Sequence, residues 1–344
     1  DPRDTEAPVK VISLEQLKQL LESLAPNPRV VASGNFAAPN VLLQAMDHAV
    51  PEFRLHMLNA QPGIPDREGI SYESSFIGGG MRRHPRLTYI PCRLSLVPIL
   101  FRDHYAPDVV LLHTSGRRDG TVSLGTEVNI LPAAIEAAKA NGGIVIAQAN
   151  AQMPYTFGDS QLYEDEIDYL IEVDEPLATK PATNFNDETR QIGVLISQRI
   201  TDGSTLQLGI GAIPDSVLNA LGTRKDLRIW TEMFSDGVLE LHRRGALNDQ
   251  VPITASFVFG GTELYQWLNL NHSVRMLRTE QTNDPGQIAR QTKMTSINAA
   301  LQVDLYDQAN ASHVRGEIYS GFGGSTDFIV GALHSKGGAS FMAL

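Results

Sequence analysis

Stretches with a helical spacing of apolar residues alternate along the chain with short, continuous apolar runs. Apolar positions three and four residues apart predict helices over Leu14–Leu24, Asn129–Ala140 and Thr189–Ile200. The continuous apolar runs predict buried strands at Val109–Leu112, Ile144–Ala147 and Tyr169–Val173. This alternation is typical of α/β folds, in which crossover helices join parallel strands.

The two halves of the chain share a pattern at a spacing of 175 residues. Residues 29–46 align without a gap on residues 204–221, with the identical pairs Gly34/Gly209, Ala37/Ala212, Pro39/Pro214, Leu43/Leu218 and Ala45/Ala220. Each segment predicts a strand, a glycine turn and a helix with proline near its start. Proline is tolerated there because the N–H groups of the first helical turn have no acceptor within the helix. The same shift places Phe53–Leu58 on Arg228–Met233, a second strand. We therefore predict an internal duplication into two similar open-sheet α/β domains.

A segment rich in proline and polar residues separates the halves. It runs over residues 174–186 without periodicity and predicts a linker near 175–188. The predicted domains are residues 1–180 and 188–344. The halves are not equivalent in chemistry, because the shift places Met57 opposite Glu232.

Glu232 lies near the middle of the segment Leu227–Gly237, which is predicted to contain one apolar strand around it. A buried polar group without a partner costs roughly 2–7 kcal/mol, so a carboxylate there needs a partner or a chemical role. One alternative is structural: Glu232 caps neighbouring backbone or pairs with Arg228. The other is catalytic, because ligands of open α/β sheets collect at the carboxyl ends of strands and a glutamate can act as a covalent nucleophile.

Two glycine loops accompany this carboxylate. Gly209–Pro214 lacks the third glycine of G-x-G-x-x-G, and no acidic residue follows cleanly about 20 residues later, so a nicotinamide site is only weakly indicated. The second loop covers residues Ser320–Gly331. Both are explained either as tight turns or as loops whose backbone N–H groups bind an oxyanion or a phosphate.

Composition narrows the function classes. The chain has 344 residues and a net charge of −11, which argues against a nucleic-acid partner. Its single cysteine, Cys92, excludes an intramolecular disulfide and CxxC zinc sites, and the nine histidines show no metal-binding spacing, so no metal is expected. No apolar stretch reaches about 18 residues, so no membrane span is expected. The polar N-terminus does not resemble a signal peptide, and a cytoplasmic location is expected.

Motifs along nearly the whole chain resemble the acetyl-CoA hydrolase/transferase family, in the branch that includes 4-hydroxybutyrate and acetate CoA-transferases. The matching runs are residues 146–154, 158–160, 167–176, 206–215, 231–237, 296–298, 302–304, 320–328 and 335–338. The resemblance implies two α/β domains of CoA-transferase type. It also implies an acyl-CoA:carboxylate CoA-transferase that works through a covalent glutamyl-CoA thioester in a ping-pong mechanism.

The resemblance also implies roles for particular residues. Glu232 stands at the position of the glutamate that becomes the thioester. The family's CoA-contacting loop is matched by Gly209, Ile210, Gly211, Ala212 and Ile213. Gly323 and Gly324 match the loop expected to line the thioester, and Asn298 falls in a segment expected near the pantetheine arm. No tightly bound cofactor is implied, since coenzyme A or acyl-CoA is the substrate and a small carboxylate is the partner.

Departures and alternatives remain at this point. Residues 113–120 differ from the family's usual loop, so the acyl pocket is expected to differ. We expect this loop and Ser33–Pro39 to cover Glu232. Family members continue past Leu344, so the second domain is expected to be truncated.

One alternative function is an acyl-CoA (acetyl-CoA) hydrolase using the same glutamate, and a remoter one is a non-catalytic CoA-binding protein. The oligomeric state stays open, with a homodimer as one alternative.

Overall fold

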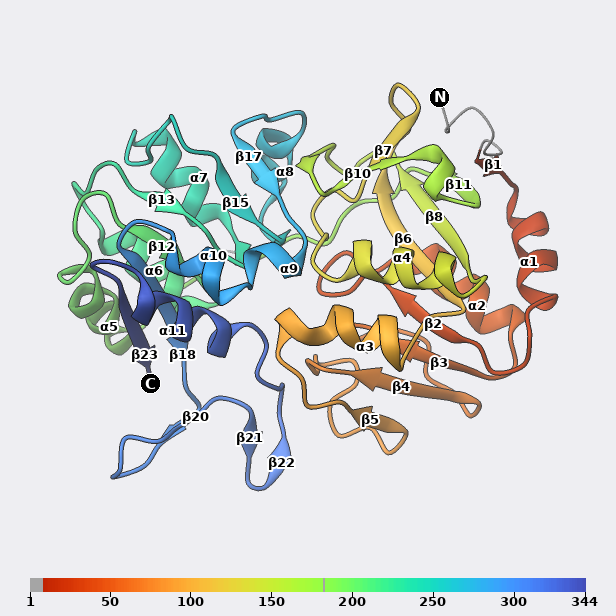
Figure 1. Cartoon of the computed structure of the whole chain (residues 1–344), viewed down its shortest axis with the longest axis horizontal. Coiled ribbons are helices and arrows are strands. Elements are labelled where there is room, and N and C mark those ends of the chain that lie inside the picture. Colours follow the sequence, from red (N-terminus) through yellow and green to blue (C-terminus); the bar gives the residue numbers. More distant parts are fainter. Residues whose placement is uncertain (1–8, 182) are drawn as a thin grey trace.

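The first half of the chain is built on a parallel eight-stranded sheet (Figure 1). The computed structural model describes residues 9–181 and 183–344. The order of strands in this sheet is β1-β11-β8-β6-β2-β3-β4-β5. The bounds are β1 (Lys10–Val11), β2 (Arg29–Ala32), β3 (Phe53–His56), β4 (Ile70–Ser74), β5 (Leu87–Tyr89), β6 (Val109–Ser115), β8 (Ile144–Asn150) and β11 (Tyr169–Val173).

Helices cover both faces of this sheet. They are α1 (Leu14–Glu22), α2 (Asn40–Ala49), α3 (Val97–Asp103) and α4 (Leu131–Ala140). The central strand β6 shows why both faces are apolar: Val109 and Leu111 belong to the cluster that includes α1 and α2, whereas Val110 and Leu112 belong to the cluster that includes α3 and α4. Successive side chains of a strand point to opposite faces, so a strand buried on both sides has a continuous apolar sequence.

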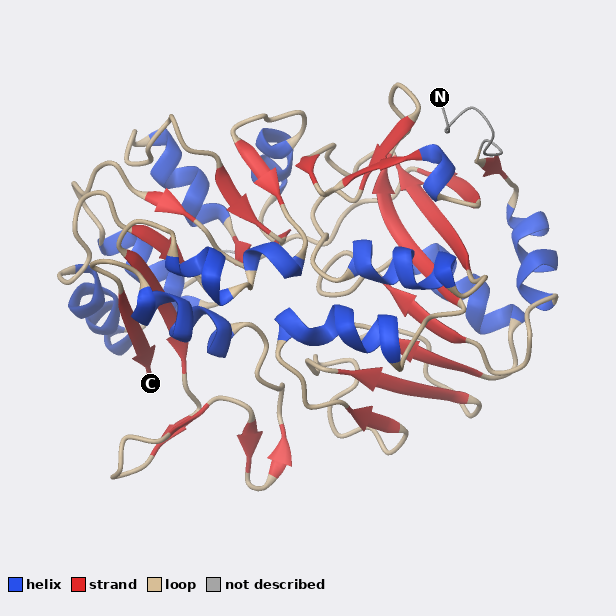
Figure 2. Ribbon diagram, in the orientation of Figure 1, coloured by secondary structure: helices blue, strands red, loops and turns tan. Residues whose placement is uncertain are grey.

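The second half is built on several smaller sheets (Figure 2). Four parallel strands have the order β13-β12-β18-β23, and shorter parallel sheets pair β14 with β16 and β15 with β17. The strands are β12 (Thr205–Gln207), β13 (Arg228–Ile229), β14 (Met233–Phe234), β15 (Ile253–Ala255), β16 (Phe257–Val258), β17 (Val274–Met276), β18 (Met294–Ala299) and β23 (Ala339–Ala343). The helices are α5 (Asp187–Ser197), α6 (Ala212–Ala220), α7 (Asp236–Arg243), α8 (Thr262–Leu268), α9 (Thr279–Thr282), α10 (Pro285–Ala289) and α11 (Ser325–His334).

Short elements complete the chain. Among the described residues, β7 (Thr121–Ser123) pairs in antiparallel fashion with β10 (Gln161–Tyr163), β19 (Gln302–Val303) with β20 (Ala309–Asn310), and β21 (His313–Val314) with β22 (Glu317–Ile318). The same part of the chain contains the 3-10 turns η2 (Leu94–Leu96) and η3 (Glu164–Glu166). Among the helices of residues 9–181 and 183–344, none combines the length and apolarity needed to cross a bilayer.

The fold confirms the predicted α/β class with parallel sheets. Both segments of the predicted repeat contain the expected order, β2–α2–β3 in the first half and β12–α6–β13 in the second, and each strand pair is parallel. One prediction is wrong: the segment Leu227–Gly237 does not hold Glu232 inside a single strand. The chain leaves β12 after Ile229 and pairs with β16 from Met233 onward, which leaves Glu232 in the break between β13 and β14.

The halves are tied together by strand pairing as well as by side chains. β9 (Phe157–Gly158) belongs to the first half in sequence but pairs in parallel with β17 of the second half. Gly158 has a φ of 107°, and a Cβ there would collide with the Met276 carbonyl oxygen. Arg278 also joins the halves through an ion pair with Glu136 at 2.6 Å.

Candidate active site

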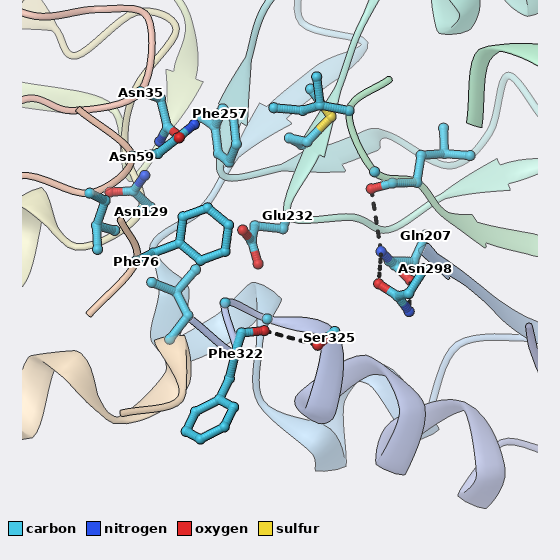
Figure 3. A pocket seen from close by; sticks show the side chains of 18 residues that line it. Asn35, Asn59, Phe76, Asn129, Gln207, Glu232, Phe257, Asn298, Phe322 and Ser325 are labelled. Atoms are coloured by element: carbon cyan, nitrogen blue, oxygen red, sulfur yellow. Dashed lines mark hydrogen bonds between the residues drawn. The ribbon is translucent and has the colours of Figure 1, made fainter. Parts of the chain in front are cut away.

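A pocket of about 240 Å³ lies between the two halves (Figure 3). From the first half it is lined by Asn35, Leu58, Asn59, Phe76, Leu94 and Asn129. From the second half it is lined by residues 207–210, Glu232, Met233, Phe257, Asn298 and residues 322–325. Several of these residues directly follow or end parallel strands, as ligand-binding residues of open α/β sheets do.

The backbone around Glu232 is fixed on both sides. The N–H groups of Ser256 and Phe257 each donate to the Glu232 carbonyl oxygen at 2.9 Å. The preceding residue, Thr231, is fully buried; its hydroxyl accepts from the Leu208 N–H at 3.0 Å and donates to the Met233 carbonyl at 2.8 Å. The break in the strand is therefore well bonded, and it presents the Glu232 side chain to the pocket.

Asn283 holds the Glu232 carboxylate. Its side-chain Nδ2 donates to Glu232 Oε2 at 3.0 Å. A second hydrogen bond fixes the orientation of this amide, because the Thr282 hydroxyl donates to Asn283 Oδ1 at 2.9 Å. Asn283 is fully buried. The sequence analysis missed this residue, because no motif or spacing relates it to a glutamate 51 positions earlier.

Burial raises the pKa of Glu232 to about 7. The hydrogen bond from Asn283 opposes this rise, and the charge of Asp327 adds to it. Glu232 does not form the ion pair with Arg228 that the structural alternative predicted. The Arg228 guanidinium instead donates to the Thr292 hydroxyl at 3.4 Å. A carboxylate with a pKa near neutrality and little solvation is suited to react as a nucleophile or base.

The second glycine loop packs directly against this carboxylate. A Cβ added to Gly324 would overlap Glu232 Oε2 and Asn283 Nδ2 and would lie 3.2 Å from Glu232 Cδ, so the close approach requires glycine. Gly324 is also the N-cap of α11. Within residues 9–181 and 183–344, no protein group accepts a hydrogen bond from the N–H of Gly323 or Gly324. Unpaired N–H groups at a helix N-terminus are a binding site for negative charge.

The first glycine loop also contributes to the second-half lining of the pocket. Gly209 and Ile210 line the pocket, and the described part of the chain offers no acceptor to their N–H groups. Beside them, Gln207 and Asn298 form a reciprocal amide pair with two hydrogen bonds of 3.2 Å (Figure 3).

The predicted site residues are thus only partly brought together. The pocket lining includes Glu232, Gly209, Ile210, Asn298, Gly323 and Gly324. It does not include three residues of the predicted CoA-contacting loop, Gly211, Ala212 and Ile213, because Gly211 is the N-cap of α6 and the other two begin that helix. The roles assigned to all these residues stay predictions.

The first half supplies a different wall from the one expected. Asn35, from the predicted loop Ser33–Pro39, lines the pocket. No residue of His113–Gly120 does, so that part of the prediction is wrong. The reason is that β6 continues to Ser115, which buries His113 in the sheet with its Nδ1 3.3 Å from the Ala37 carbonyl oxygen.

A second buried carboxyl group, Glu127, lies behind this wall and was also missed. Its Oε1 accepts hydrogen bonds from Nδ2 of Asn35, at 2.8 Å, and of Asn129. Burial raises the pKa of Glu127 to about 8, against the effect of both amides, and Glu232 adds to the rise. Within the described residues, no group of three or more histidine, cysteine, aspartate or glutamate side chains is arranged to hold a metal ion.

Comparison with known proteins agrees with this arrangement. The N-terminal domain profile of the acetyl-CoA hydrolase/transferase family matches residues 25–180, and the C-terminal domain profile matches residues 260–344. The 4-hydroxybutyrate coenzyme A transferase of Clostridium kluyveri is 34% identical over 97% of this chain and 81% of its own. The chain belongs to the acetyl-CoA hydrolase/transferase family.

Two further members show the range of the family. The crystal structure of 4-hydroxybutyrate CoA-transferase from Porphyromonas gingivalis superimposes with a TM-score of 0.79 at 32% identity, covering 97% of this chain and 81% of that one. An acetyl-CoA hydrolase of Neurospora crassa is 26% identical over 73% of this chain and 57% of its own. The family thus contains transferases and hydrolases, and this member is an enzyme of one of these two kinds.

Proposed function

We propose that this family member is an acyl-CoA:carboxylate CoA-transferase in which Glu232 is the covalent nucleophile. The observation that carries the proposal is the setting of the Glu232 carboxylate. It faces a pocket, it is held by one amide and by no cation among the described residues, and it lies against Gly324 beside unpaired N–H groups. A carboxylate that served only to stabilise the fold would gain from a cationic partner in place of a raised pKa.

The first step is attack of a Glu232 carboxylate oxygen on the thioester carbonyl of an acyl-CoA. A carbon–oxygen bond forms, the carbon–sulfur bond breaks, and CoA leaves as a thiolate, so an acyl-glutamyl anhydride remains. The oxygen of the carbonyl becomes an oxyanion during the attack. Within the described residues the N–H of Gly324 has no acceptor, which supports a role for this glycine loop in stabilising such a charge.

The second step returns the thiolate to the enzyme. Its sulfur attacks the glutamyl carbonyl of the anhydride, the acyl carboxylate leaves, and the Glu232–CoA thioester remains. An acceptor carboxylate then reverses both steps and departs as the new acyl-CoA. Each step exchanges one nucleophile for one leaving group, so no proton is gained or lost overall, and covalent catalysis divides the reaction into two half-reactions.

Intact-protein mass spectrometry tests this proposal. Incubation with acyl-CoA and no acceptor should add the mass of CoA minus one water, and borohydride should reduce the resulting thioester. Peptide mapping should place the adduct on Glu232. The variant Glu232→Gln keeps the size and an oxygen for the Asn283 hydrogen bond, so it should fold and give no adduct. A Glu232→Gln enzyme with normal turnover, or wild type without any adduct, would refute the assignment.

The hydrolase alternative is favoured by one specific finding, the similarity to acetyl-CoA hydrolases. Both functions use the same glutamate, and they differ in whether water reaches the acyl or thioester intermediate. We favour the transferase, because the relative that matches 97% of this chain is a CoA-transferase. Release of CoA without an added carboxylate should therefore be much slower than acyl exchange. Equal rates would assign the chain to the hydrolases.

A further inference from the structure

The second glycine loop belongs to the second half in sequence, but its first residues, 320–324, are bonded to the first half. Ser320 accepts a hydrogen bond from the Ile77 N–H at 2.6 Å, and Gly323 accepts one from the Leu94 N–H at 3.1 Å. In Figure 3 this part of the loop runs beside Glu232. Its position next to the proposed nucleophile therefore depends on contacts between the halves.

Asp327 adds a side-chain contact at the same place. It lies in the first turn of α11, three residues after Gly324, and it is fully buried. Its Oδ2 accepts from the Ser95 N–H at 3.3 Å, and its Oδ1 bonds to the Ser95 hydroxyl at 2.9 Å. The Arg93 guanidinium lies 3.5 Å from Oδ1. Consecutive residues of the first half, 93–95, thus contact the glycine loop and the helix that follows it.

The partners of Asp327 are not those of an ordinary helix-capping acid. An acidic residue in the first turn commonly stabilises its own helix. In the described part of the chain, the hydrogen bonds to the Asp327 carboxyl group come instead from Ser95, in the other half. Burial raises the pKa of Asp327, and the bonds from Ser95 and the charge of Arg93 oppose this rise. The buried charge is therefore compensated only while the two halves are in contact.

We propose that Asp327 is a positioning residue of the reaction, which binds residues 93–95 of the first half and thereby holds Gly323 and Gly324 beside Glu232. This inference rests on the proposed function. Among the described residues, the N–H groups of both glycines have no acceptor. Such groups stabilise an oxyanion only when they are held at the right distance from it. Without the contact, the start of α11 is free to shift relative to Glu232.

The test is the single-turnover rate of adduct formation with saturating acyl-CoA. It is measured on the plateau of each variant's pH–rate profile, so that the effect of the Asp327 charge on the pKa of Glu232 does not enter. Asp327→Ala should lower this rate at least about tenfold. The loss should be smaller than the roughly 10²-fold of a full displacement, because Phe328 and Ala332 of α11 still pack against Ile288. The acyl-CoA concentration for half-maximal rate should change less than about threefold, since Asp327 does not line the pocket.

Two further variants separate the contact from the charge. Asp327→Asn keeps an oxygen that accepts from the Ser95 N–H, so its plateau rate should stay within about threefold of wild type. Ser95→Ala removes the hydroxyl and keeps the charge of Asp327. It should slow the reaction about three- to fivefold, and it should add no further loss to Asp327→Ala, because both changes remove the same contact.

Glu317→Ala is the matched control. Glu317 is also an acidic residue of the second half that pairs with an arginine of the first half, Arg83, at 2.7 Å. It is exposed and does not line the pocket. Its loss should leave the plateau rate within about twofold of wild type, and a loss as large as that of Asp327→Ala would overturn the specific role of Asp327.

The remaining outcomes are distinct. A folded Asp327→Ala enzyme with the wild-type plateau rate overturns the proposal, because Asp327 then serves stability alone. An Asp327→Asn enzyme as slow as Asp327→Ala also overturns it, because the charge and not the contact is then responsible. If Asp327→Ala does not fold, a wild-type rate in Ser95→Ala decides against the proposal. All these results leave the covalent mechanism standing, whereas a wild-type enzyme that forms no adduct overturns the proposed function and this inference with it.

Discussion

Replacing Gly324 by alanine adds one methyl group at the most crowded point of the site. The new Cβ would occupy the space of Glu232 Oε2 and Asn283 Nδ2, which are hydrogen-bonded to each other. Asn283 cannot retreat easily, because it is fully buried and its Oδ1 is held by Thr282. The Glu232 side chain must therefore move into the pocket, away from the amide that holds it.

The expected loss in reaction rate follows from this displacement of the Glu232 carboxylate. The carboxylate must move by roughly 1 Å or more, and a misplacement of that size costs about 10²-fold in rate. A hundredfold loss corresponds to about 2.7 kcal/mol of activation free energy. The lost hydrogen bond from Asn283 adds a further effect in the same direction, because it stabilises the ionised form of Glu232. We therefore expect Gly324→Ala to slow adduct formation at least a hundredfold.

The assay is the single-turnover rate of adduct formation with saturating acyl-CoA at fixed pH. Gly116→Ala is the matched control, because a Cβ there meets no atom within 4 Å and Gly116 does not line the pocket. The control should react like wild type, and the melting temperature of both variants should show that they fold. A folded Gly324→Ala enzyme that reacts within threefold of wild type would show that Gly324 does not position Glu232.

Further predictions concern ionisation and stability. Adduct formation should increase with pH up to about 7, the pKa of Glu232; Asn283→Ala should shift this limb to higher pH and Asp327→Asn to lower pH, as pH–rate profiles would show. Because the pKa of Glu232 is raised from 4.5 to about 7, ionisation of this group destabilises the fold; the cost is absent below 4.5, grows with pH and is complete above about 7. Glu232→Gln should therefore raise the melting temperature near pH 8 and much less near pH 5, as thermal unfolding at the two pH values would show. Gly158→Ala should lower the free energy of unfolding by more than about 1 kcal/mol, measured by denaturant titration, because its φ of 107° is strained for alanine.

Much of the fold was predictable because its signals are local. The apolar runs of β6, β8 and β11 mark strands buried on two faces, and their positions agree with the predicted strands. The helix predicted over Leu14–Leu24 begins where Ser13 forms a capping box with Gln16, although it ends at Glu22. The break at Glu232 was not predictable, because it arises when one segment changes partner from β12 to β16.

The residues of the candidate site likewise divide into those that a sequence motif reveals and those that only the three-dimensional structure reveals. Glu232 and Gly324 were found because each stands in a recognisable run of residues. Asn283 bonds to Glu232, 51 positions away in the chain, and one of the two amides that bond to Glu127 belongs to Asn35, 92 positions away. A lone asparagine or a glutamate in a polar segment carries no periodic or motif signal, so contacts of this kind emerge only in three dimensions.

The pairing of β9, from the first half, with β17, from the second half, determines how the protein behaves when its halves are expressed separately. A chain divided in the 175–188 segment would leave β17 without β9 on that side, and an unpaired strand edge is a template for aggregation. Each piece expressed alone would carry that exposed edge or an orphaned strand. The two halves are therefore expected to melt in one cooperative transition, and fragments should regain solubility when they are produced together in the same cell.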